Sequence, residues 1–147
     1  MKSEARARPT PTAADATLQA QLATLQLLHL REHYEALAAE AARRQISHVD
    51  YLAELIEGEV HRREQRSLQR RIRAARLPVL KTLDGFDWGW PRKINREQVC
   101  NLFRLAFLAE HTNVVLVSNV GLGKTHLMTA LAHAACVRGH SVRFTTA

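Results

Sequence analysis

The chain has 147 residues, which is enough for one ordinary domain or two small ones. Its content of 46% hydrophobic and 24% charged residues is that of a soluble globular protein, and no apolar run is long enough for a membrane span or a signal peptide. The net charge is +7, and residues 61–76 hold seven arginines against one glutamate, which leaves the rest of the chain near neutrality. We therefore expect a cytoplasmic protein, not bound to membranes, with one segment suited to an anionic polymer.

Residues 1–17 are rich in Ala, Thr and Pro and show no periodicity, which predicts a disordered arm. From Leu18 to about residue 44, apolar side chains recur at spacings of three and four. The alanine-rich stretch "EALAAEAARR" favours helix by intrinsic propensity as well. This part of the chain is therefore predicted to be helical.

A second helix is predicted over residues 48–75. Ser47 is suited to an N-cap, and Asp50 three residues later resembles the second member of a capping box. Leu77 precedes Pro78, and a residue before proline avoids the helical conformation, so the helix should end at about Ala75. We assign residues 18–80 to a small all-α N-terminal domain.

The second half of this helix is amphipathic. A helical wheel places Leu68, Ile72 and Ala75 on one side, with Arg71 straying toward them, and a band of five arginines roughly opposite. These arginines are Arg62, Arg63, Arg66, Arg70 and Arg73. The band is either a solvated helix face or a surface that contacts nucleic-acid phosphates without selecting a base sequence.

Isolated cysteines and histidines give no strong signal for a metal site. Cys100 and Cys136 belong to no C-x-x-C pair and are interpreted as buried, reduced thiols. His29 and His33 lie one helical turn apart, but no third ligand is apparent.

Residues 81–94 form a predicted linker, because "TLDGFDWGWP" is rich in glycine and ends in proline. Phe86, Trp88 and Trp90 in this linker could stack on a nucleic-acid base, but packing against the following domain is favoured. Residues 95–147 are assigned to that domain. Its predicted elements are a helix over 96–111 capped by Asn95, a strand over 113–119, a helix over 125–138 and a strand over 141–147.

The stretch "VSNVGLGKTH" nearly matches the phosphate-binding pattern G-x-x-x-x-G-K-[ST]. Gly121 and Gly123 allow the backbone to turn its amides toward an anion, and the following helix directs its positive dipole end to the same place. Lys124 could then reach the β- and γ-phosphates of a nucleotide, and the Thr125 hydroxyl could ligate Mg²⁺. The predicted nucleotide-binding residues are Ser118, Asn119, Val120, Gly121, Leu122, Gly123, Lys124, Thr125 and His126.

Ser118 stands where the pattern has its first glycine, and two alternatives remain open for the loop. If position 118 needs an unusual backbone angle, its Cβ would cost about 1–3 kcal/mol of strain and weaken the site. The other alternative is a glycine-rich turn between strand and helix that binds nothing.

"NVVLVSNVGLGKTHLMTALAHAACVRGHSVRFTTA", together with "RRIRAARLPVLKTLDGFDW" before it, resembles the IstB family, the ATP-binding helper proteins of bacterial insertion sequences. The resemblance implies an α/β fold, a P-loop NTPase core of the AAA+ type, behind a small helical domain. It also implies ATP and Mg²⁺ as cofactors, homo-oligomers on DNA and a partner transposase. Gly121, Gly123, Lys124 and Thr125 match the family's loop, whereas Ser118 and Leu122 depart from it.

Members of that family continue beyond the point where this sequence stops, and the further residues include the Walker B acids, a sensor residue and an arginine finger. We therefore expect a truncated copy that does not hydrolyse ATP alone, with two strands whose neighbours in the sheet are missing. A helicase loader similar to DnaC is one alternative function. A non-catalytic DNA-binding fragment, or an inert remnant of a mobile element, is another.

Overall fold

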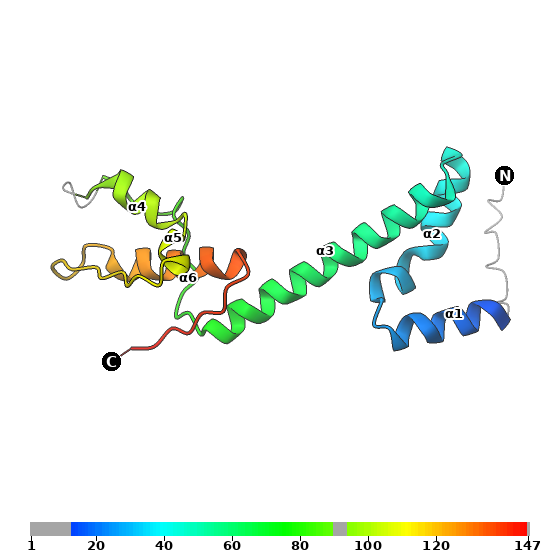
Figure 1. Ribbon diagram of the computed structural model, residues 1–147, viewed down its shortest axis with the longest axis horizontal. Helices are drawn as coiled ribbons and strands as arrows, with labels where there is room; N and C mark the ends of the chain where they lie inside the picture. The colour runs from blue at the N-terminus through cyan, green and yellow to red at the C-terminus, as the bar shows by residue number, and fades with distance from the viewer. Residues whose placement is uncertain (1–12, 90–93, 147) are drawn as a thin grey trace, which may run out of the picture. The chain divides into compact units, whose positions relative to one another are not determined.

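The computed structural model describes residues 13–89 and 94–146 (Figure 1). The chain forms two compact units, Met1–Glu64 and Gln65–Ala147. The described residues form six α-helices. They are α1 (Ala13–Thr24), α2 (Leu28–Arg44), α3 (His48–Ala75), α4 (Arg96–Leu102), α5 (Ala106–Ala109) and α6 (Lys124–Val137). The division falls inside α3, whereas the sequence placed the end of the helical domain at residue 80. No helix of the described residues has the length and apolar character needed to cross a membrane.

Helices α1 and α2 and the first part of α3 form the first unit around a leucine core. Leu22, Leu30 and Leu55 are buried there, and the hydroxyl of Tyr51 on α3 donates a hydrogen bond to the Tyr34 carbonyl on α2 at 2.9 Å. The predicted helical stretch is divided because Gln26 adopts a positive φ of 56° between α1 and α2. The expected arm over 1–17 overlaps α1 at residues 13–17, and its residues 1–12 lie outside the described residues.

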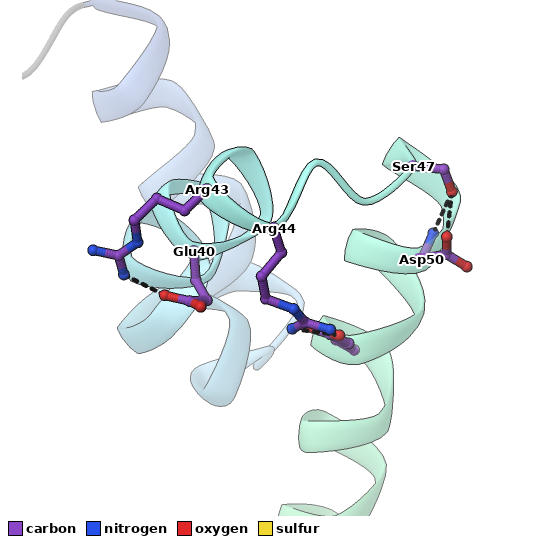
Figure 2. Close-up of polar contacts among 6 residues, drawn as sticks. Glu40, Arg43, Arg44, Ser47 and Asp50 are labelled. Carbon is purple, nitrogen blue, oxygen red and sulfur yellow. Dashed lines mark hydrogen bonds and ion pairs between the residues drawn. The ribbon is translucent and has the colours of Figure 1, made fainter.

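The predicted bounds of α3 are confirmed. The Ser47 hydroxyl oxygen accepts a hydrogen bond from the Asp50 backbone N–H at 3.1 Å and donates one to the Asp50 carboxylate at 2.7 Å (Figure 2). At the other end Arg76 has a positive φ of 53°, and the helix stops at Ala75, three residues before Pro78. An ion pair between Arg44 on α2 and Glu54 on α3, with the two atoms 3.0 Å apart, ties the two helices together.

The second unit packs the linker against the C-terminal segment, as predicted. Phe86 from the linker, Val99 from α4 and Leu127 from α6 form its buried cluster, and Trp88 packs on it. Trp90 lies outside the described residues. The cluster contains side chains that are far apart in the sequence, so the linker is a structural part of this unit.

The end of α3 is anchored in the same unit by two hydrogen bonds. The Arg71 Nε donates to the Cys136 carbonyl at the end of α6 at 2.9 Å, and the Ala75 carbonyl accepts from the Phe144 backbone N–H at 2.8 Å. Ala75 and Cys136 are both fully buried. The inward position predicted for Arg71 is therefore confirmed.

The helix predicted over 96–111 is interrupted. Its Asn95 cap is confirmed, because the side-chain oxygen accepts from the Gln98 N–H at 3.0 Å, but α4 ends at Leu102 and α5 starts at Ala106. Leu105 between them is buried and has a positive φ of 62°. The interruption leaves the Arg104 carbonyl free to accept a hydrogen bond from the Arg138 guanidinium at 2.6 Å.

The predicted α/β fold, a P-loop NTPase core of the AAA+ type, is wrong for this structure. Residues 113–119 and 141–146 belong to no regular element, and the described ranges contain no β-strand. A strand requires a neighbour for its N–H and C=O groups, and β-branched residues supply only the local preference for extended backbone. Leu116 packs on the core, while Val115 and Val117 beside it are largely exposed.

Candidate functional site

Two glycines shape the turn before α6. Gly121 and Gly123 both have φ of +81°, a left-handed conformation that favours glycine, and Gly123 occupies the N-cap position of α6. The Leu127 N–H donates to the Gly123 carbonyl at 3.0 Å and so starts the helix. The turn expected of these glycines is therefore present, and it brings Lys124 to the first residue of a 14-residue helix.

Lys124 folds back over the loop that precedes it. Its Nζ donates hydrogen bonds to the Asn119 carbonyl at 2.7 Å, the Ser118 carbonyl at 2.8 Å and the Ser118 hydroxyl at 3.1 Å. An ammonium group has three N–H donors, and these three oxygens can use all of them. The loop therefore holds the cation next to its own backbone.

Ser118 is not strained in the way that its place in the motif suggested. It is absent from the described residues with positive φ, so its Cβ causes no left-handed strain. Its hydroxyl also donates to the Asn119 carbonyl at 3.3 Å. The serine in the glycine position therefore adds an oxygen that fixes Lys124.

The remaining predicted loop residues have different surroundings. Thr125 and Val120 are exposed, Leu122 is half-buried, and the Thr125 carbonyl accepts a hydrogen bond from the Thr129 hydroxyl at 2.8 Å. His126 is held by the linker, because its Nε2 lies 2.9 Å from the Thr82 carbonyl and its ring stands edge-on to Phe86. The structure thus places His126 against the linker.

The linker also packs directly against the loop, a contact that was not predicted from the sequence. The Phe86 ring meets the Trp88 ring edge to face at 5.0 Å, and the Arg96 guanidinium lies over Trp88 at 5.0 Å from the ring centre. Phe86 also contacts Gly123 so closely that a side chain at that glycine would collide with the ring. An aromatic-rich linker was the available signal, but its contact with the loop depends on the folded chain.

A cleft of about 650 Å³ borders the loop, between residues 113–118, α4 and α6. This volume falls within the usual range of small-molecule sites. Most of the wall is apolar and includes the buried Val99 and Leu127, and the loop contributes Ser118, Leu122 and Lys124. The only cationic side chain among its lining residues is therefore the lysine of the motif.

The predicted arginine band divides into paired and unpaired members. Arg62 forms an ion pair with Glu32 at 2.5 Å, and Arg63 forms one with Glu59 at 3.1 Å. The side chains of the other three are exposed, form no hydrogen bond or ion pair among the described residues, and are spaced to share one helix face. They are Arg66, Arg70 and Arg73.

Two further predictions concern cysteines and histidines. Both cysteines are free, but only Cys136 is buried, where burial raises the pKa of its thiol, and Cys100 is exposed, so the prediction of burial is wrong there. The rings of His29 and His33 stack with their centres 4.3 Å apart. No group of three or more metal-binding side chains occurs in the part of the chain that the structure describes.

A left-handed glycine turn that delivers a lysine to the start of a helix is the local geometry of phosphate-binding loops. Residues 20–147 match the model of the family described as IstB-like ATP binding protein, and the chain belongs to this family.

Several proteins of bacterial insertion sequences are similar to this chain, and each is named as an ATP-binding protein. The IS21 protein of Pseudomonas aeruginosa is 38% identical over 127 residues, covering 86% of this chain and 48% of that protein. A protein of Mycobacterium tuberculosis is 35% identical over 130 residues, covering 88% and 52%. The IS5376 protein of Geobacillus stearothermophilus is 32% identical over 123 residues, covering 84% and 49%. The chain thus spans about half the length of these relatives.

Proposed function

We propose that this chain binds ATP through residues 118–125. The observation that carries the proposal is the position of Lys124. The turn at Gly121 and Gly123 makes it the first residue of α6, and its ammonium is hydrogen-bonded to the loop. The first amides of a helix lack partners within it, and the helix dipole places a partial positive charge there. Loop, dipole and lysine together suit the negative charge that nucleotide phosphates supply.

The residues present fit such a group. A Cβ built on Gly121 meets nothing within 4 Å, so there is open space beside the turn, and the cleft next to it includes Lys124 in its wall. A bound phosphate would compete with Ser118 and Asn119 for the lysine ammonium. The exposed Thr125 would hold Mg²⁺ through its hydroxyl.

We also propose that the unpaired arginines of α3 contact DNA phosphates. Arg66, Arg70 and Arg73 need break no ion pair to do so, whereas Arg62 and Arg63 would have to leave Glu32 and Glu59. Contacts of this kind fix a protein on DNA without reading its sequence. In the whole protein, these two binding functions would serve an ATP-dependent helper of DNA transposition that assembles on DNA and works with a transposase.

The nucleotide proposal is tested by thermal unfolding with and without Mg-ATP. A ligand that binds only the folded state stabilises it by about 2.7 kcal/mol at a concentration of 100 Kd, so the wild-type chain should gain several degrees in Tm. Lys124→Ala should lose this gain and keep its binding to DNA. Lys81→Ala, an exposed lysine outside the loop, is the matched control and should respond like the wild type. A Lys124→Ala chain that ATP still stabilises fully would refute the assignment.

A further inference from the structure

The first half of α3 carries a second apolar face that no described residue of the first unit covers. Val49, Leu52, Ile56 and Val60 are between 45% and 75% exposed. Their spacing of three and four residues places them on one face of the helix, together with the exposed Ala53. We call these five residues the α3 stripe.

The face of α3 that packs in the first unit is a different one. Leu55 is buried against Leu22 and Leu30, and Tyr51 binds the Tyr34 carbonyl. A helix that packs one apolar face in its own core normally presents charged or polar side chains elsewhere. A second contiguous apolar face on such a helix marks an interaction surface.

The charges beside the α3 stripe indicate what could cover it. Asp50, Glu57 and Glu64 recur every seven residues and follow one edge of the stripe. Glu57 and Glu64 have no bonding partner among the described residues, and together with Val60 they line a cleft of about 500 Å³. Gly58 also lines this cleft. The edge is therefore an acidic row next to an apolar stripe, with room for a long side chain.

A second copy of this chain is a poor partner for the α3 stripe. In an antiparallel pair of helices the acidic row would face its own copy, and like charges in such positions repel. In a parallel pair each member of the row would lie opposite the partner residue five positions earlier in the sequence. Glu57 would then face Leu52 and Glu64 would face Glu59, so no cation would meet the row. DNA is excluded for the same reason, because its phosphates are anionic.

We propose that the α3 stripe docks an amphipathic helix of another protein, one whose apolar face is bordered by lysine or arginine. The apolar residues of that helix would pack between Val49 and Val60, and its basic residues would pair with Glu57 and Glu64. This surface shares no residue with the nucleotide loop or with the three unpaired arginines, so the proposal does not depend on either binding function.

The test uses two fluorescent helical peptides of about three heptads, with the same isoleucine and leucine seam. One carries lysine along both edges of the seam and the other carries glutamate there. Polarisation titrations with the full chain should show saturable binding of the lysine peptide. The affinity for the glutamate peptide should be lower by a factor of about ten or more. Equal affinity for the two peptides, or binding of neither, would overturn the proposal.

Two variants locate the site, and circular dichroism checks that each is folded. Glu57→Lys should weaken binding of the lysine peptide and strengthen binding of the glutamate peptide. Misfolding would not produce such a reversal. Ile56→Glu should abolish binding, whereas Val79→Glu, at an exposed valine outside the stripe, should leave it unchanged. Sedimentation of the chain alone should show no self-association through this face. A dimer that Ile56→Glu dissociates would show that a second copy is the occupant and would overturn the proposal.

Discussion

Gly123 lies directly against the ring of Phe86: a Cβ atom on this glycine would be 2.7 Å from the Phe86 Cε2. The last glycine of the loop thus rests on the aromatic side chain that closes the core of the second unit. Gly121 has the same φ of +81°, but a Cβ there would meet nothing within 4 Å. The two glycines have the same backbone requirement and differ in their surroundings, so their contributions can be separated.

Gly123→Ala should destabilise the second unit more than Gly121→Ala does. Each alanine bears the strain of a left-handed backbone, about 1–3 kcal/mol, and only the one at 123 also displaces a buried ring, for about 1–3 kcal/mol more. Urea unfolding followed by tryptophan fluorescence measures this, because both tryptophans, Trp88 and Trp90, belong to the second unit. Equal losses of unfolding free energy in the two variants would contradict the role of Phe86.

Ser118→Ala should increase the affinity for ATP. The Ser118 hydroxyl is one of three oxygens that bind the Lys124 ammonium, and a phosphate has to replace them. Loss of one hydrogen bond of about 0.5–1.5 kcal/mol corresponds to an affinity about two to ten times higher. Competition with a fluorescent ATP analogue measures the change, and Ser141→Ala, at an exposed serine outside the loop, is the control. A weaker or unchanged affinity would show that the serine does not compete with the nucleotide.

The three unpaired arginines should determine the salt dependence of DNA binding. Three phosphate contacts predict a slope of about −3 for log affinity against log salt concentration, measured by anisotropy with a labelled duplex. Replacing Arg66, Arg70 and Arg73 by alanine should bring the slope close to zero. Arg62→Ala, which removes an arginine already paired with Glu32, should change it by less than about one unit. If this single change flattens the slope as much as the triple one, the division of the band is incorrect.

The first unit should lose stability as the pH falls below 6.5. Burial and the nearby His33 lower the pKa of His29 from its ordinary value of 6.5, and Arg62 acts in the same direction, while Glu59 and Glu32 oppose them. The unfolded chain therefore binds a proton at a higher pH than the folded chain does. Stability is fully present above pH 6.5 and is lost as the pH falls through the lowered pKa.

Urea unfolding at a series of pH values measures this effect, with tyrosine fluorescence as the probe, because Tyr34 and Tyr51 both belong to the first unit. His29→Gln should reduce the pH dependence in this range, and His140→Gln, at an exposed histidine of the second unit, should not. An unchanged pH profile in the His29 variant would assign the effect to another group.

Glu59 shows how a buried charge can be stabilised in the same region. Burial alone would raise the pKa of its carboxyl, but hydrogen bonds from the His29 backbone N–H at 2.8 Å and from Arg63 outweigh burial, and the pKa is lowered. Gly58 beside it leaves room for the His29 ring, since a Cβ there would be 2.0 Å from the His29 Nε2.

Gly58→Ala should therefore destabilise the wild type, although alanine is the better helix former. In a His29→Ala background the same change should stabilise the protein by about 1 kcal/mol, the helix-propensity difference between glycine and alanine. A double-mutant cycle from tyrosine-monitored unfolding measures the coupling between the two residues. Equal effects of Gly58→Ala in both backgrounds would rule out the contact between residue 58 and the His29 ring.

Features set by neighbouring residues could be predicted from the sequence. The Ser47 cap and Pro78 determine both ends of α3, and glycine at 121 and 123 determines the left-handed turn. The division between α4 and α5 could not be predicted, because it accompanies burial of Leu105 and a hydrogen bond from Arg138, 34 residues away, to the Arg104 carbonyl, and both depend on the folded chain. The prediction of two strands was wrong for a related reason, since β-branched residues favour extended backbone but cannot supply a pairing partner.

In the candidate site, too, features that depend on local sequence could be predicted, and features that depend on distant contacts could not. The motif predicted the place of Lys124 at the start of α6, because spacing along the chain determines it. The contact of His126 with Thr82, 44 residues away, depends on how the linker folds back. Pairing of Arg62 with Glu32, 30 residues away, likewise reduced the predicted arginine band in a way that no helical wheel could indicate.

Titration calorimetry with Mg-ATP tests the central claim most directly. Because Lys124 and the first amides of α6 form the proposed phosphate site, the wild-type chain should release or absorb heat and saturate at one nucleotide per chain. Lys124→Ala should give no saturable heat under the same conditions. A wild-type titration without heat at several temperatures, or the same affinity in the variant, would contradict a nucleotide site at residues 118–125.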